Sequence, residues 1–175
     1  MPALSVGWAR IRGMSINMQL RATPESEIRE DWTWLAEFMG GALDHFQDEL
    51  RAGIAEMVEY HFHALHEVYR AAYEPQGSWE WELPIFGGSP VFEATRDHPP
   101  FVILRPAVVR EAADFLTTAS FDDLWEAARP TVLPPFSAFD EAEVKGWFLG
   151  HHTDLHAFYS RTASAGQAVV KAFWY

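Results

Sequence analysis

Alternating apolar and polar side chains mark residues 16–22 as a β-strand. The apolar positions are Ile16, Met18, Leu20 and Ala22. Residues 168–175 are rich in β-branched and aromatic side chains, which favour strands. A frayed tail would leave Val169, Phe173 and Trp174 in water, so this segment is expected to pair into a sheet. We therefore predict that the two terminal strands lie close together in one sheet.

Apolar residues at helical spacing predict the elements between these strands. One helix is expected to begin at Thr23-Pro24, an N-cap followed by proline, and to end at Gly40-Gly41. A second helical pattern covers residues 43–72, either as one helix or as two helices broken at Gly53. Further helices are predicted at residues 106–116, 120–130 and 140–166, the last two with capping boxes at Ser120 and Asp140.

Between residues 74 and 100 prolines and glycines recur too often for a regular helix, which predicts a long loop. Residues 101–104 (FVIL) are typical of a short buried strand. The order of elements predicts a single α+β domain over residues 14–175, with about five helices packed around a small mixed or antiparallel sheet that contains both terminal strands. Residues 1–13, which precede a second methionine, are interpreted as an N-terminal extension.

Composition narrows the classes of partner. The 175 residues, 49% of them hydrophobic, suit one domain with a single core. A formal net charge of −12 disfavours nucleic acid and anionic membrane surfaces, because both are bound by clustered cations. A basic protein partner or a small ligand fits this charge better, and the sequence gives no indication of the oligomeric state.

The chain has no cysteine, which excludes disulfides, thiolate catalysis and cysteine-ligated metals. A metal site would have to use histidine and carboxylate ligands. The sequence shows neither a signal peptide nor an apolar run of membrane-spanning length, so a cytoplasmic location is expected. No motif indicates a cofactor, and none is expected.

Histidines are the first candidates for chemistry. The helical pattern places His61 on the apolar stripe of the central helix, beside Ile54 and Leu65, and His151 on that of the last helix. We consider that the two rings converge, with Glu59 or Asp154 nearby, in a proton-transfer or metal site. The alternative is that both are hydrogen-bonded core histidines without a function.

Two histidine motifs have the spacing of metal ligands. His152 and His156 are four residues apart on one helix, and His61, His63 and His66 form an HxHxxH pattern. Neither motif contains the glutamate of the metalloprotease HExxH sequence, so His152 and His156 are weak candidates for metal ligands.

The proline- and glycine-rich loop contains the second candidate site. It brings together Trp79, Trp81, Phe86, Gly87 and Gly88, which are candidates for lining a ligand pocket or a protein interface. The alternative is that these rings fold over the core. Gly87-Gly88 lacks the context of a phosphate-binding loop.

Several segments together resemble the YfbM-like family of small bacterial proteins, a domain of unknown function (domain of unknown function 1877). The matching segments are MSINMQLRATPESEI at residues 14–28, Ala64-Leu65-His66, Ile85-Phe86-Gly87-Gly88, residues 104–116, and DLHAFYSRTASAGQAVV at residues 154–170. His63 and Arg105 depart from the family pattern, which identifies the chain as a divergent member. The resemblance implies an α+β domain of unassigned activity and brings no catalytic residues with it.

No complete catalytic signature is present, so the leading hypothesis is a non-enzymatic binding or protein-interaction module. One alternative is a small hydrolase or metal-dependent enzyme that uses the core-facing histidines. A further alternative is an acidic inhibitor or immunity-type protein, which only the net charge supports.

Overall fold

In the computed structural model, which describes residues 16–175, the centre of the protein is a five-stranded antiparallel sheet with strand order β2-β1-β5-β4-β3. The strands are β1 (Asn17–Thr23), β2 (Ala55–Glu59), β3 (Ser89–Val91), β4 (Phe101–Leu104) and β5 (Ala168–Trp174). Strands β1 and β5 pair along their full length, from Asn17 opposite Trp174 to Thr23 opposite Ala168. The prediction that the two terminal strands share one sheet is therefore confirmed. The predicted extension at residues 1–13 lies outside the described residues.

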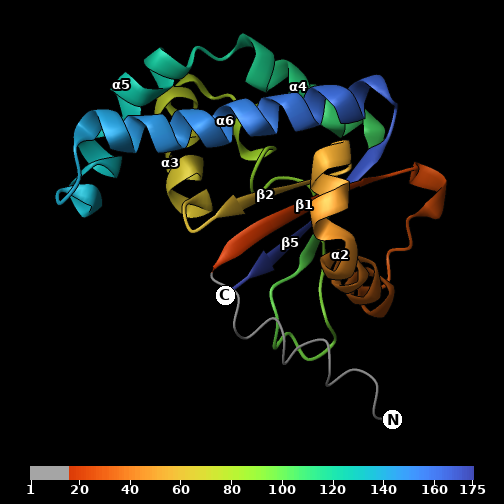
Figure 1. Cartoon of the computed structure of the whole chain (residues 1–175). Helices are drawn as coiled ribbons and strands as arrows, with labels where there is room; N and C mark the ends of the chain where they lie inside the picture. Colours follow the sequence, from red (N-terminus) through yellow and green to blue (C-terminus); the bar gives the residue numbers. More distant parts are fainter. Residues whose placement is uncertain (1–15) are drawn as a thin grey trace.

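Helices cover both faces of this sheet (Figure 1). They are α2 (Trp32–Ala52), α3 (Phe62–Tyr73), α4 (Pro106–Thr118), α5 (Phe121–Val132) and α6 (Glu141–Ser164). Short 3-10 turns lie at Glu25–Glu27, Glu74–Gln76, Glu80–Glu82 and Pro134–Phe136. Helix α2 packs on one face, and α3 to α6 form the thicker layer on the other. The predicted α+β class is confirmed.

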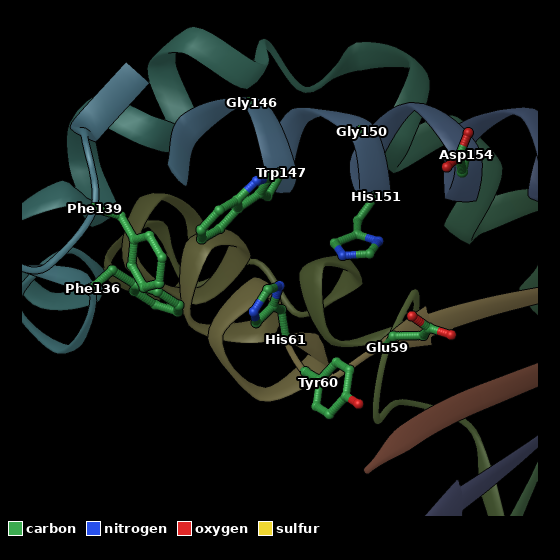
Figure 2. Close-up of a pocket in the computed structure, with 10 residues that line it drawn as sticks. All are labelled: Glu59, Tyr60, His61, Phe136, Phe139, Gly146, Trp147, Gly150, His151 and Asp154. Carbon is green, nitrogen blue, oxygen red and sulfur yellow. The ribbon is translucent and has the colours of Figure 1, made fainter. Parts of the chain in front are cut away.

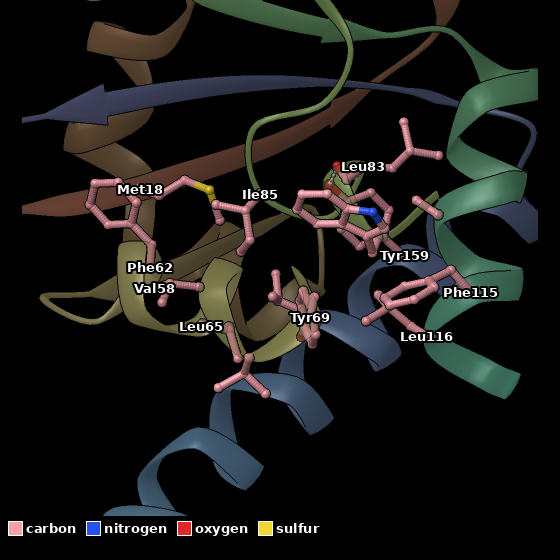
Figure 3. Packing of buried hydrophobic residues seen from close by; sticks show 14 of the residues in the cluster. Met18, Val58, Phe62, Leu65, Tyr69, Leu83, Ile85, Phe115, Leu116 and Tyr159 are labelled. Atoms are coloured by element: carbon pink, nitrogen blue, oxygen red, sulfur yellow. Dashed lines mark hydrogen bonds between the residues drawn. The ribbon is translucent and has the colours of Figure 1, made fainter. Parts of the chain in front are cut away.

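Side chains of β5 point alternately to the two faces of the sheet, which explains why there are two hydrophobic cores. Val169 and Phe173 point into the large core beneath α3 to α6, whereas Val170, Ala172 and Trp174 point toward α2. Every residue of β5 is buried, as expected for a central strand covered on both faces. Figure 3 shows the large core, where aromatic side chains from α3 and α6 meet aliphatic ones from the sheet. Burial of each large apolar side chain there contributes about 1.5–3 kcal/mol.

Helix α2 differs from the prediction at both ends. Thr23 belongs to β1, and Pro24 is followed only by a 3-10 turn, so the helix begins later, after Asp31, whose side chain accepts a hydrogen bond from the Trp34 N–H at 2.8 Å. Gly40-Gly41 was expected to end the helix, but α2 continues through it to Ala52. A glycine inside a helix costs only about 1 kcal/mol, which burial of the α2 apolar stripe offsets.

The prediction of helix over residues 43–72 is wrong in its middle, where the chain forms β2. Gly53, with φ of 71°, ends α2 and reverses the chain. Residues 55–59 then pair with β1, which places Met18 opposite Val58. A segment of five residues is too short to show a reliable helical or strand periodicity, and its pairing with a neighbouring strand decides its conformation. The sequence analysis also missed β3. It predicted that α5 ends at Pro130, whereas this proline lies inside the last turn of the helix, which ends at Val132.

A buried lysine holds the long loop to the sheet. Lys171, in the middle of β5, is completely buried, and its Nζ donates to the backbone carbonyl oxygens of Leu83, Ile85 and Gly87. The Tyr159 hydroxyl donates to the Pro84 carbonyl oxygen at 3.1 Å. These bonds pair carbonyl groups that the irregular backbone leaves without partners in regular structure.

Candidate functional site

An open cleft of about 440 Å³ lies between α6 and the junction of β2 with α3 (Figure 2). We call it the two-histidine cleft. Its lining residues are Glu59, Tyr60, His61, Phe136, Phe139, Gly146, Trp147, Gly150, His151 and Asp154. The aromatic residues Phe136 and Phe139 lie at one end, and the carboxylates Glu59 and Asp154 lie at the other.

The junction between β2 and α3 forms the lower wall of the cleft. Tyr60 there has φ of 55°, a left-handed conformation that costs a non-glycine residue about 1–2 kcal/mol. Its backbone N–H donates to the Ile16 carbonyl oxygen at 2.8 Å, and its side chain is 59% exposed. A tyrosine in a conformation that suits glycine or asparagine better, with its ring left in solvent, is a feature that packing does not explain.

The other wall is one face of α6. Trp147, His151 and Asp154 are spaced by four and three residues and therefore follow one another along this face. Gly146 and Gly150 each precede one of these aromatic residues, Trp147 and His151, and a Cβ at either glycine would meet no atom within 4 Å beyond its chain neighbours and the nearby backbone of the helix. Small residues therefore keep this stretch of the cleft open.

The two imidazoles meet in the cleft. The ring centroids of His61 and His151 are 5.9 Å apart, with planes at 69°. His61 also stacks on Trp147 at 5.8 Å and contacts the edge of Phe136 at 5.5 Å. The sequence argument placed His61 within a helix beside Ile54, but His61 precedes α3, and Ile54 is 44% exposed before β2. The proximity of the rings is thus a result of the β2–α3 junction rather than of a helix face.

Both imidazoles are held in the neutral form. Burial lowers the pKa of His61. Burial also lowers the pKa of His151, with His61 adding to the effect and the carboxylates of Asp154 and Glu59 opposing it. The Nδ1 atom of His61 is buried, and no described residue forms a hydrogen bond with it. Neutral rings beside two exposed carboxylates leave the cleft with a negative charge.

His152 and His156 point to different neighbours. The Nδ1 atom of His152 is 3.1 Å from the Tyr69 hydroxyl of α3, whereas the Nε2 atom of His156 is 3.0 Å from the Thr117 hydroxyl of α4. The remaining members of the HxHxxH pattern pack against aromatic rings, His63 on Tyr175 and His66 on Trp81. Within residues 16–175, no group of three or more histidines and carboxylates is arranged to hold a metal ion.

The structure places most of the aromatic loop against the core. Trp81 is 5% exposed, and Phe86 packs at the edge of the large core. A Cβ at Gly87 would lie 2.9 Å from the Leu83 backbone, so Gly87 permits close packing of the loop. Gly88 adopts a φ of 130°, which favours glycine. Of the two tryptophans in the loop, Trp79 is exposed, at 53%. These candidate binding residues do not line the two-histidine cleft.

Sequence reasoning considered that His61 and His151 converge with Glu59 or Asp154 nearby, but it missed the aromatic part of the cleft. Phe136 and Phe139 come from the connection between α5 and α6, whose direction no local pattern reveals. Tyr60 was missed because the segment was assigned to a helix. The sequence does contain one signal, the pair of glycines four residues apart on the face of α6 that carries His151.

Comparisons with known proteins agree with the fold. The model of a family described as a domain of unknown function (DUF1877) matches residues 14–171. The crystal structure of a protein of unknown function, YfbM from Escherichia coli, is similar with a TM-score of 0.59 and 13% sequence identity, over 90% of this chain and 99% of that chain. At this identity the likeness concerns the fold alone. A search of curated proteins finds no match.

Among the described residues, no helix combines the length and the apolar character that crossing a membrane requires.

Proposed function

Since the chain belongs to the DUF1877 family, whose function is unknown, we propose from its own geometry that it is a non-enzymatic binding module and that the two-histidine cleft is its ligand site. The observation that carries this proposal is the convergence of four aromatic residues and two neutral imidazoles on one open cleft of about 440 Å³. Volumes of this order hold small ligands, and aromatic walls with a few polar groups are typical of binding sites.

Backbone strain at the rim supports the same location. Non-glycine residues with positive φ concentrate at functional sites, where the surrounding structure maintains them. Tyr60 combines such a conformation with a ring that is mostly exposed beside His61. A ligand in the cleft would cover part of this ring and give the strained residue a role.

A second candidate function is acid–base catalysis by His61 and His151. It is favoured by one observation, the 5.9 Å separation of the two rings beside the open cleft. Against it, no hydrogen bond from a described carboxylate orients either ring, and the described residues that line the cleft include no serine or threonine to act as a nucleophile. Binding is therefore the better-supported function.

The test is a screen of small organic molecules by NMR, with the imidazole signals of His61 and His151 and the indole signal of Trp147 as reporters. We expect ligands that shift these signals together, while the exposed His45 on α2 serves as an internal reference.

The matched variants are Gly150→Leu, which fills the cleft from α6, and Gly41→Leu, which adds the same side chain to α2. Gly150→Leu should weaken binding about tenfold or more, and Gly41→Leu should leave it unchanged.

Two results would overturn the proposal. Ligands whose shifts map to other parts of the protein, or whose affinity is the same in Gly150→Leu, would place the binding site elsewhere. Conversion of a bound compound to product by the wild-type protein, lost in both His61→Ala and His151→Ala, would favour the catalytic alternative.

A further inference from the structure

We propose that the ligand of the two-histidine cleft is a small organic amine, bound as an ammonium ion on an apolar body. This inference rests on the proposed function and specifies the chemical class of the ligand. It follows from the charge of the cleft, its hydrogen-bonding atoms and the distribution of its aromatic rings.

The charged side chains that line the cleft within residues 16–175 are all acidic. Glu59 and Asp154 line it, and no lysine or arginine of this part of the chain does. A hollow that shares Phe139 with the cleft is lined by Arg129, which pairs with Glu141 at 3.1 Å and so has its charge balanced locally. A phosphate or carboxylate ligand would meet two like charges in the cleft without a counter-charge, whereas an ammonium ion would be attracted.

The polar atoms in the cleft suit a ligand that donates hydrogen bonds. Neutral imidazole offers one acceptor nitrogen, and the carboxylates of Glu59 and Asp154 are acceptors. The Nδ1 atom of His61 is buried and has no hydrogen-bond partner among residues 16–175. An ammonium group has three N–H donors and no acceptor, so it complements this set, and charge-assisted bonds to carboxylates are the strong ones.

The aromatic residues provide the surface for an apolar body. Phe139 and Tyr60 are more than half exposed, and Phe139 meets Trp147 at a ring-centroid distance of 5.0 Å. Figure 2 shows Phe136, Phe139 and Trp147 on one side of the two imidazoles and Glu59 on the other. A ligand with an apolar ring at one end and an amine at the other matches this order of groups. Faces of the aromatic rings also attract a cation that passes over them.

The experiment compares two probes of nearly equal shape, benzylamine and benzyl alcohol, by titration at neutral pH with the indole NMR signal of Trp147 and the imidazole NMR signals of His61 and His151 as readouts. Benzylamine is a cation there and benzyl alcohol is neutral. We expect benzylamine to bind about tenfold more tightly. Combined Glu59→Gln and Asp154→Asn substitutions should remove most of this difference while leaving the affinity for benzyl alcohol unchanged.

A second acidic hollow supplies the control. Glu111 and Asp114 line a separate depression beside α4, together with Glu80 but without a histidine. The Glu111→Gln and Asp114→Asn double variant makes the same change in net charge and should leave the benzylamine preference intact. Loss of the preference in both double variants would attribute it to overall charge and would overturn the inference.

Equal affinity for the two probes would also overturn the amine class, while leaving the cleft as an apolar binding site. Tighter binding of benzoate than of benzylamine would do the same. If neither probe shifts the cleft signals, the inference fails, and the proposed function is then judged separately by the wider screen and by the Gly150→Leu variant.

Discussion

At the scale of single residues, His152 shows how burial sets a protonation state. Its side chain is 7% exposed and lies between Tyr69 and Phe121, with Nδ1 hydrogen-bonded to the Tyr69 hydroxyl. Burial, with a smaller contribution from His156, lowers the pKa of His152 to about 4. The ring is therefore neutral at physiological pH and acts as a packed, hydrogen-bonded part of the core.

This pKa predicts a loss of stability in acid. An unfolded histidine takes up a proton near pH 6.5, whereas His152 in the folded protein does so only near pH 4. Between these values the unfolded state binds more protons, so the stabilisation is complete above about pH 6.5 and declines as the pH falls toward 4. The decline attributable to this residue is on the order of 3 kcal/mol.

Urea unfolding at pH 7 and at pH 4.5 measures the effect. The His152→Gln variant retains an acceptor for Tyr69 but does not titrate, so its stability should fall less between the two pH values than that of the wild type. His45→Gln, at an exposed position of α2, is the control and should behave as the wild type. An equal acid loss in His152→Gln would show that this ring does not contribute to the acid sensitivity.

At the scale of elements, the long loop between α3 and β4 is ordered by its contacts with β5. Three backbone carbonyl groups of the loop bind one ammonium group, that of Lys171, which burial holds at a pKa well below that of a free lysine. The same loop packs Trp81, Leu83 and Ile85 into the large core. These contacts hold the proline- and glycine-rich segment in a defined conformation, packed against the sheet.

Replacement of Lys171 by methionine should therefore destabilise the protein. Methionine fills a similar volume but leaves the carbonyl oxygens of Leu83, Ile85 and Gly87 buried without this donor, at a cost of about 1–3 kcal/mol for each group that finds no other partner. We expect a loss of at least about 2 kcal/mol in the free energy of unfolding, measured with urea.

The chain's other lysine is a matched control. Lys145 forms a surface pair with Asp122 at 2.7 Å, and such pairs contribute about 0–1 kcal/mol. Lys145→Met should therefore cost much less than Lys171→Met. A similar cost for the two variants would mean that the three carbonyl bonds do not stabilise the loop.

At the scale of the whole molecule, β5 joins the two parts of the sheet. It lies between β1 and β4, and the two cores meet on its opposite faces. The β2–β1 pair and the β4–β3 pair are connected in the sheet only through β5. Cooperative folding of the described domain therefore depends on β5.

Truncation after Gln167 should abolish folding. It removes β5 and so separates the two strand pairs and exposes both cores to water. Circular dichroism and the dispersion of amide NMR signals would show the loss. Removal of Tyr175 alone, a residue that is 67% exposed, should leave a folded protein. Native-like spectra from the longer truncation would contradict the central role of β5.

Local patterns explain which parts of the fold were predictable. The strand alternation at β1, the apolar run at β4 and the cap at Asp140 are properties of a few neighbouring residues, and the corresponding elements form as expected. The helix start at Thr23-Pro24 and the stop at Gly40-Gly41 were wrong, because a cap signal and a glycine pair are weak preferences that packing overrides. The family resemblance, which depends on the order of several segments, was confirmed.

By itself the amino-acid sequence determined the α+β class, the pairing of the terminal strands and the acidic, cysteine-free character of the protein. These follow from composition and periodicity, which act over short distances along the chain. Only the tertiary structure decided that residues 55–59 form a strand, that Lys171 binds the loop, and that His61 meets His151 beside Phe139. Each of these depends on contacts between residues far apart in the sequence, whose geometry exists only after the sheet and helices have packed together.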